Sequence, residues 1–246
     1  MLGLRVLLHS VKLVFLNWQT ALRISSPIIA VGLAFAVLFG SSDVSFDFEN
    51  PPSDFPWGAV TLFGIAYVVA GLWVAVAWHR YVLLEEDSGS IVPRFRGNRI
   101  GAYLLQGILL SLIVILAAVV VGTVSGLIFT LVGGMAGVFL TTLVVTGVLL
   151  WIFYRLSPTL PAAALGEALS IGNAWRKTSA YSGAILIMVI AMSVLSSLFG
   201  SIVESFAGVS SLIYVLLSVV QTWVSLMVGI SVLTTIYGIA VEYREL

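Results

Sequence analysis

Residues 100–154 read IGAYLLQGILLSLIVILAAVVVGTVSGLIFTLVGGMAGVFLTTLVVTGVLLWIFY, and no charged side chain occurs among them. A transmembrane helix needs about 20 mostly apolar residues to cross roughly 30 Å of hydrocarbon. The stretch is therefore long enough for two membrane-spanning helices with a tight turn between them. Gly133, Gly134 and Gly137 lie between the two apolar halves and supply the backbone freedom that such a turn needs.

The composition of the whole chain indicates the same class of protein. Of its 246 residues, 60% are hydrophobic and only 9% are charged, whereas soluble domains contain about 45–50% apolar and about 25% charged residues. A soluble fold of this length has too little interior to hide so many apolar side chains. Further uncharged stretches cover residues 24–42, 55–79, 178–203 and 205–241. We therefore expect the bilayer to surround most of this chain.

We predict an all-α polytopic transmembrane helix bundle that forms one domain over residues 1–246. Six spans, arranged as three helical hairpins, are expected at about 24–41, 57–78, 101–131, 137–154, 183–203 and 211–240. Each hairpin begins and ends near aromatic and basic residues, which favour the membrane interfaces. The three hairpins are either a true internal repeat or three pairs of spans with ordinary interfacial anchors, and both interpretations stay open.

Residues 4–22 show the periodicity of an amphipathic helix that precedes the first span. One face carries the apolar side chains of Leu4, Leu7, Leu8, Val11, Val14, Phe15, Trp18 and Leu22. The opposite face carries Arg5, His9, Lys12, Gln19 and Arg23. Such a helix can lie in the membrane interface with its basic side towards lipid head groups. The alternative is that it continues the first span and packs on neighbouring helices.

The basic residues predict the orientation of the chain. With six spans, all eleven fall on the same side of the membrane: Arg5, Lys12, Arg23, Arg80, Arg94, Arg96, Arg99, Arg155, Arg176, Lys177 and Arg244. The other side carries only the acidic side chains of Asp43, Asp47, Glu49, Asp54 and Glu204. Because cytoplasmic loops are enriched in Lys and Arg, we predict that both termini are cytoplasmic.

Patterns typical of catalytic, cofactor-binding or metal-binding sites are missing from the sequence. There is no cysteine, no HExxH pair, no Walker loop and no GxSxG motif. His9 and His79 lie far apart at predicted cytoplasmic edges, and we interpret His79 as an interfacial anchor. The three acids at residues 85–87 form either a solvated turn, which we favour, or a cation site. We therefore predict no catalytic, cofactor or metal residue, and a protein that is not an enzyme.

Polar groups inside the predicted spans are few. Apart from serine and threonine they comprise Gln106, near the start of a span, and Gln221, near the middle of one. Intramembrane acids and bases mark the ion pathways of many transporters, and the predicted spans contain none. Gln221 is the candidate intramembrane polar contact, either for a neighbouring helix, which we favour, or for a substrate. The zero net charge argues against a nucleic-acid partner.

Three segments resemble uncharacterised bacterial membrane-protein families. Residues 168–178 read ALSIGNAWRKT, follow Pro158 and Pro161, and precede a predicted span. This pattern is similar to one in YciC-like proteins and in the membrane-domain portion of some glycerophosphodiester phosphodiesterases. Residues 77–81, AWHRY, and 93–97, PRFRG, resemble alphaproteobacterial members of such families. The resemblance implies a six-span protein of the bacterial inner (plasma) membrane and no established activity.

The sequence favours a non-enzymatic accessory, scaffold or assembly subunit of a larger inner-membrane complex. Its expected partners are membrane lipids and other membrane-protein subunits. Candidate contacts with these partners are Arg5, Lys12, Trp18, Arg94, Arg96, Arg99, Trp175, Arg176 and Lys177. The alternative is a transporter or channel for a small neutral or lipid-like molecule, which predicts a continuous cavity that reaches the middle of the membrane between the hairpins. A third interpretation is a lipid-binding protein that uses the basic side of residues 4–22.

Overall fold

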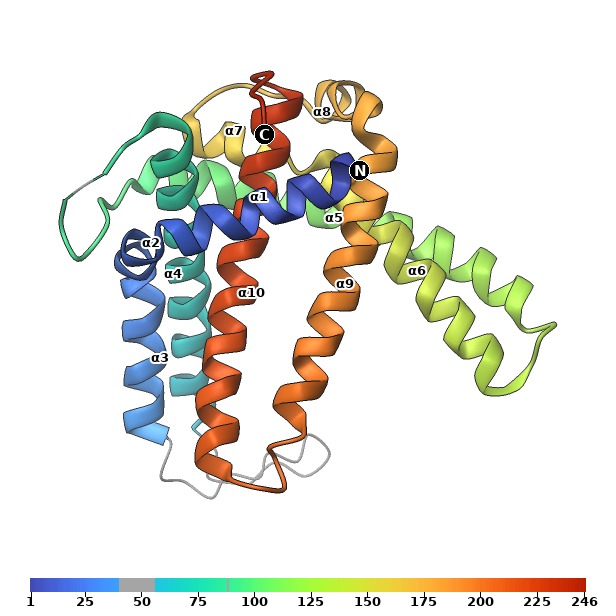
Figure 1. The fold of residues 1–246 in the computed structure, drawn as a ribbon, viewed down its shortest axis with the longest axis horizontal. Helices are drawn as coiled ribbons and strands as arrows, with labels where there is room; N and C mark the ends of the chain where they lie inside the picture. Colours follow the sequence, from blue (N-terminus) through green and yellow to red (C-terminus); the bar gives the residue numbers. More distant parts are fainter. Residues whose placement is uncertain (40–55, 88) are drawn as a thin grey trace.

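The computed structural model describes residues 1–39, 56–87 and 89–246, and every regular element among them is helical. The α-helices are α1 (Leu2–Leu16), α2 (Trp18–Ile24), α3 (Ser26–Phe39), α4 (Trp57–Leu84), α5 (Gly97–Phe129), α6 (Gly134–Leu156), α7 (Thr159–Leu165), α8 (Ile171–Lys177), α9 (Ser182–Glu204) and α10 (Ser211–Ala240) (Figure 1). One turn of 3-10 helix, Ser179–Tyr181, precedes α9. This arrangement confirms the all-α prediction. The predicted acidic loop with Asp43, Asp47, Glu49 and Asp54 lies outside the described residues.

Five segments are long and apolar enough to cross a membrane: α4, α5, Gly134–Leu165, Ser179–Glu204 and α10. A sixth is added if α2 and α3 are counted together as one span that is bent by 59°. The chain is therefore a multi-pass helical membrane protein. The predicted span 211–240 coincides with α10, whereas α4 continues beyond its predicted end at Trp78 as far as Leu84.

The expectation of one continuous amphipathic helix over residues 4–22 is wrong. α1 ends at Leu16, and Asn17 (φ −113°, ψ 30°) turns the chain into α2. The side-chain amide of Asn17 donates to the carbonyl of Leu13 at 2.9 Å, and its side-chain oxygen accepts from the hydroxyl of Tyr81 on α4 at 3.0 Å. A short polar side chain that bonds to nearby backbone competes with continuation of a helix. The bond to Tyr81 then holds this corner against α4.

Helix α1 lies across α9 and α10, at the end of the molecule where both termini are found (Figure 1). Its buried face consists of Gly3, Val6, Leu7, Ser10 and Val14. Gly3 allows a close approach, because a Cβ at this position would overlap the carbonyl oxygen of Ala184 on α9. The hydroxyls of Ser10 and Thr235 on α10 share a hydrogen bond of 2.9 Å. The helix therefore ties α9 to α10.

The other sides of α1 and α2 remain exposed. Their exposed apolar side chains are Leu4, Leu8, Phe15, Leu16, Trp18 and Leu22. Arg5 and Lys12 are exposed as well. A helix with an apolar side and a basic side is suited to the surface of a bilayer. The sequence pattern shows an apolar and a basic side of this segment. The structure shows in addition that one side of α1 packs against α9 and α10.

Three helical hairpins follow: α3–α4, α5–α6 and α9–α10. Helices α4 and α10 also pack on each other, whereas the α5–α6 hairpin leans away from the upright helices (Figure 1). Only 6% of the most apolar window of α5 is buried inside the protein, against 28% for α10. The predicted glycine turn lies at the tip of the hairpin, where Gly133 (φ +71°) and Gly134 (φ +56°) have positive φ. Gly137, also expected in the turn, lies instead within α6, where a Cβ would overlap the carbonyl oxygen of Phe129. The hairpin thus presents apolar side chains on nearly all sides.

The core includes buried polar side chains close to the end where the termini lie. His79 on α4 is fully buried, with Nδ1 2.8 Å from Oγ1 of Thr234 and Nε2 3.3 Å from the hydroxyl of Tyr103. The interpretation of His79 as an interfacial anchor is therefore wrong. Because α4 continues to Leu84, the imidazole lies inside the helix bundle, between α5 and α10.

We expect Gly3→Ala to destabilise the protein, because the new Cβ would force α1 away from the backbone of α9. Overpacking of this kind costs about 1–3 kcal/mol. The measurement is thermal unfolding of the purified protein in mild detergent. Gly32→Ala is the matched control, since nothing lies within 4 Å of a Cβ at that helical position, and it should leave the midpoint unchanged or slightly raised. Equal effects of the two substitutions would contradict the close packing of α1 on α9.

Candidate functional site

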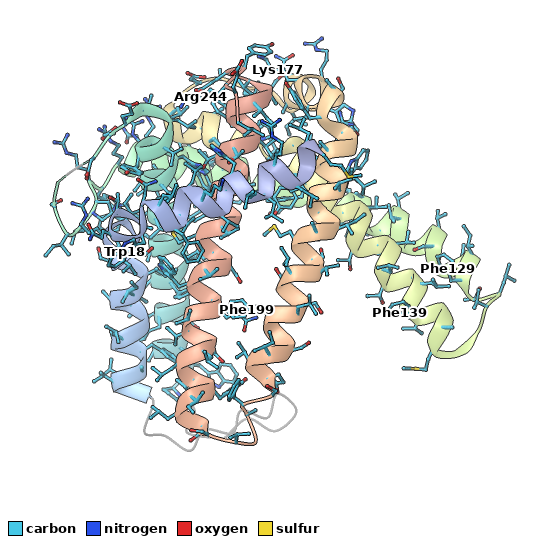
Figure 2. The ribbon with its side chains drawn as sticks, in the orientation of Figure 1. Trp18, Phe129, Phe139, Lys177, Phe199 and Arg244 are labelled. Carbon is cyan, nitrogen blue, oxygen red and sulfur yellow. The ribbon has the colours of Figure 1, made fainter. Side chains whose placement is uncertain are left out.

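All described Lys and Arg side chains lie at one end of the molecule, which we call the basic end. It contains α1, α2, α7 and α8, together with the last turns of α4, α6 and α10 and the first turn of α5. Figure 2 shows Lys177 and Arg244 there. Among the described residues, the opposite end carries a single charged side chain, Glu204. The partition of charges in the sequence is therefore also a partition in space.

A charged cluster at the basic end is centred on Glu86. Its carboxylate accepts hydrogen bonds from Nε of Arg80 at 2.8 Å and from Nε of Arg96 at 3.0 Å. The neighbouring Asp87 pairs with Arg23 at 3.1 Å. Burial raises the pKa of Glu86, but the hydrogen bonds from Arg96 and Arg80 lower it by more, so its pKa lies below the ordinary value of 4.5. These pairs join α2, α4 and the start of α5.

Trp175 and Arg155 form a second cluster, which the sequence analysis did not identify. The guanidinium of Arg155, at the end of α6, lies 3.7 Å from the ring centroid of Trp175 on α8 and 5.3 Å from that of Trp151. Arg155 also donates to the hydroxyl of Thr178 at 3.3 Å. This cation–π contact docks α8 on α6. Trp175 is thus engaged within the chain, and 38% of it remains exposed.

The remaining predicted contacts are spread over the basic end and do not form one pocket. The exposed ones are Arg5, Lys12, Trp18, Arg94, Arg99 and Arg176. Arg96 is engaged with Glu86, and Lys177 lies over the ring of Tyr243, 5.4 Å from its centroid. Because these side chains come from separate elements, they make up a broad cationic surface.

A cleft between α9 and α10, towards the end opposite the basic end, has a volume of about 660 Å³. Its lining residues are Gly200, Ser201, Val203, Glu204 and Ser205 of α9 and Tyr214, Ser218 and Gln221 of α10. We call it the polar cleft. Figure 1 shows the two helices running side by side from the point where α1 crosses them to the loop that joins them. In Figure 2, Phe199 of α9 points into the space between them.

Three functional groups of the polar cleft have no hydrogen-bonding partner within the described part of the chain: the carboxylate of Glu204, the hydroxyl of Tyr214 and the amide of Gln221. The side-chain nitrogen of Gln221 reaches towards α9 and would lie 3.3 Å from a Cβ at Gly200. The serine hydroxyls, by contrast, donate to carbonyls of their own helices, from Ser201, Ser205 and Ser218. The cleft therefore offers a carboxylate, a phenol and an amide for external contacts.

The sequence analysis selected Gln221 but missed the other side chains of the polar cleft. A signal for them was present, because Tyr214, Ser218 and Gln221 recur at the spacing that places side chains on one face of a helix. The same spacing relates Ser201 to Ser205 on α9. That these two faces meet across a cleft depends on how α1 holds the helices, which periodicity does not reveal.

No protein-family model, no curated protein and no solved structure matches this chain. A functional proposal therefore rests on the polar cleft, the cationic surface and the exposed helices themselves.

We expect the Glu86 cluster to make stability depend on pH in the acid range. Because the folded pKa is depressed, the contribution is fully present above the ordinary value of 4.5 and is lost as the pH falls through the lower folded value. Glu86→Gln should remove this part of the dependence in thermal unfolding curves. It should also cost about 0.2–1 kcal/mol for each ion pair at neutral pH. Glu245→Gln, at an exposed acid, is the control, and identical pH profiles for Glu86→Gln and the unmodified protein would contradict the assignment.

Proposed function

We propose that this chain is a non-enzymatic accessory, scaffold or assembly subunit of a larger membrane complex, and that it receives a transmembrane helix of another subunit in the polar cleft. The observation that carries the proposal lies within a membrane-spanning helix: the side chains of Tyr214 and Gln221 have no hydrogen-bonding partner among the described residues. Hydrocarbon provides no partner for such groups, whereas hydroxyl, amide and small side chains of a neighbouring helix do.

The depth of Gln221 supports a helix as the occupant. Gln221 is ten positions from Ser211, the first residue of α10, which places it about 15 Å along the helix. This is roughly half of the 30 Å hydrocarbon thickness, beyond the reach of head groups. Gly200 and Ser201 stand opposite on α9, and small residues of this kind let the backbone of another helix approach closely.

The α5–α6 hairpin gives the proposed subunit a second surface for assembly. It leans away from the other spans (Figure 1) and leaves almost all of its apolar windows unburied by the chain itself. Lipid tails can cover these side chains at no cost, and so can the helices of a larger complex. A hairpin held at one end and free at its tip is therefore compatible with contact to a second subunit.

The proposed orientation follows from the basic end. We place the basic end, with both termini, in the cytoplasm because Lys and Arg are enriched in cytoplasmic segments. The polar cleft then opens on the opposite side. We also propose that this membrane is the bacterial inner membrane, a proposal that rests on the resemblance of residues 168–178 to bacterial families. In this orientation the cationic surface, including Arg5 and Lys12, meets the anionic head groups of the cytoplasmic leaflet.

A second candidate function is transport or binding of a small neutral or lipid-like molecule. The observation that favours it is the volume of the polar cleft, about 660 Å³, which lies within the range of ligand pockets. The lining hydroxyls and the amide of Gln221 would then contact the solute. Passage to the other side requires movement of α1, which crosses α9 and α10 at the basic end.

We expect a cysteine at Ser218, in the polar cleft, to capture a discrete partner chain when it carries a photoactivatable cross-linker in intact membranes. The chain has no cysteine of its own, so only this site reacts. Adding Gln221→Leu should reduce capture roughly 3- to 18-fold, because hydrogen bonds between membrane helices contribute about 0.6–1.7 kcal/mol. Native mass spectrometry in mild detergent measures the same association.

Val219→Cys is the matched control, because Val219 is the next residue, lies outside the cleft and is 62% exposed. It should capture the partner weakly. Equal capture from both positions, or a solitary chain in membranes and in mild detergent, would contradict helix docking and would leave the solute site as the explanation of the cleft. A cross-link to a second copy would identify this chain as its own partner.

A further inference from the structure

A second opening lies between α4 and α5. The two helices meet near the basic end and separate where the α5–α6 hairpin leans away (Figure 1), which leaves a groove of about 360 Å³. We call it the α4–α5 groove. Its mainly apolar lining, contributed by four helices, includes Leu72, Leu104, Gly107, Ile108, Phe153 and Leu160. Because these helices lie in hydrocarbon, an acyl chain is the molecule at hand to fill such a groove.

The end of the groove nearest the basic end is defined by Tyr103. Its hydroxyl lies 3.3 Å from Nε2 of the buried His79, so the polar atom is satisfied and the ring contributes to the lining. One turn further, Gly107 adds no side chain, and a Cβ there would lie 4.0 Å from Cδ2 of Leu160. A Cβ there would touch Leu160, so the glycine keeps this part of the groove lining free of a side chain from α5.

On α5, Arg99 precedes the residues that line the groove and lies on their basic-end side. It lies one helical turn before Tyr103 on the same face of α5. Its guanidinium rests against Gly166 at the end of α7, where a Cβ would overlap it. Arg99 is exposed and takes part in none of the ion pairs of the described segments, whereas the neighbouring Arg96 is paired with Glu86. It is thus a positioned cation with no acidic partner there.

We propose that the α4–α5 groove binds an anionic phospholipid, with one acyl chain in the groove and its phosphate at Arg99. The cation lies at the level of the membrane interface, and the groove continues from there into the hydrocarbon. A phospholipid has its phosphate and its acyl chain at the same two levels. A guanidinium binds phosphate through charge-assisted hydrogen bonds. The acyl chain gives the apolar side chains of the groove the van der Waals contacts that they lack when the groove is empty. The bound lipid packs against the end of the α5–α6 hairpin nearest the basic end and stabilises the angle between this hairpin and α4. This site is independent of the polar cleft.

Native mass spectrometry of the full chain in neutral detergent tests the head-group part of the proposal. We expect phosphatidylglycerol to be retained in preference to phosphatidylcholine with the same acyl chains. Arg99→Gln should lower phosphatidylglycerol binding about fivefold, the effect of one interfacial cation, and should remove most of the preference. Arg176→Gln, which deletes an exposed charge on α8, is the control and should retain the preference for phosphatidylglycerol. Equal losses in the two variants would show diffuse attraction and overturn the site.

The acyl-chain part is tested by filling the groove. Gly107→Leu should lower the binding of both lipids, whereas Gly122→Leu should not, because nothing lies within 4 Å of a Cβ at that position of the same helix. Ile108→Trp, at a lining residue that is 49% exposed, is a second filling variant in case the leucine at 107 disturbs folding, which thermal unfolding reports. Unchanged lipid binding by either filling variant in its folded form would overturn the proposal.

Discussion

Hydrocarbon cannot solvate a charge, and this constraint decides where the polar groups of the protein lie. The described cations gather at the basic end, where Glu86 holds two arginines and the short helices α1, α7 and α8 cover the long ones. Hydrogen bonds between helices concentrate near the same end, as between Ser10 and Thr235 and between His79 and Thr234. Packing is therefore dense at the basic end and sparse towards the tips of the hairpins.

Both candidate binding regions are consequences of that gradient. α9 and α10 are tied together by α1 near the basic end, and towards the opposite end they leave the polar cleft between them. α4 and α5 meet at His79 and Tyr103 and separate beyond them, which opens the α4–α5 groove. A bundle that packed equally along its whole length would have neither opening. We propose a lipid for one opening and a helix of another subunit for the other, and the proposed accessory role rests on the second of these.

Hydrophobic length alone predicts α10 and the glycine turn at residues 133–134, because a spanning helix must be apolar along roughly 30 Å whatever it packs on. The conformation at Asn17 and the burial of His79 cannot be predicted from hydrophobic length. The corner at Asn17 depends on a hydroxyl from α4, and the burial of His79 depends on α5 and α10 closing around it. The polar cleft is an intermediate case. Gln221 stands out by its chemistry, whereas Tyr214 joins the site only because α10 faces α9 across the cleft.

The account depends on the basic end and the polar cleft lying on opposite sides of one hydrocarbon layer. Since the chain contains no cysteine, single cysteines at Arg176 on α8 and at Ser205 beside the cleft can each report the side on which they lie. In sealed right-side-out vesicles, a membrane-impermeant maleimide should label Ser205→Cys directly and Arg176→Cys only after the vesicles are opened. Labelling of both cysteines from the same side of intact vesicles would contradict the account.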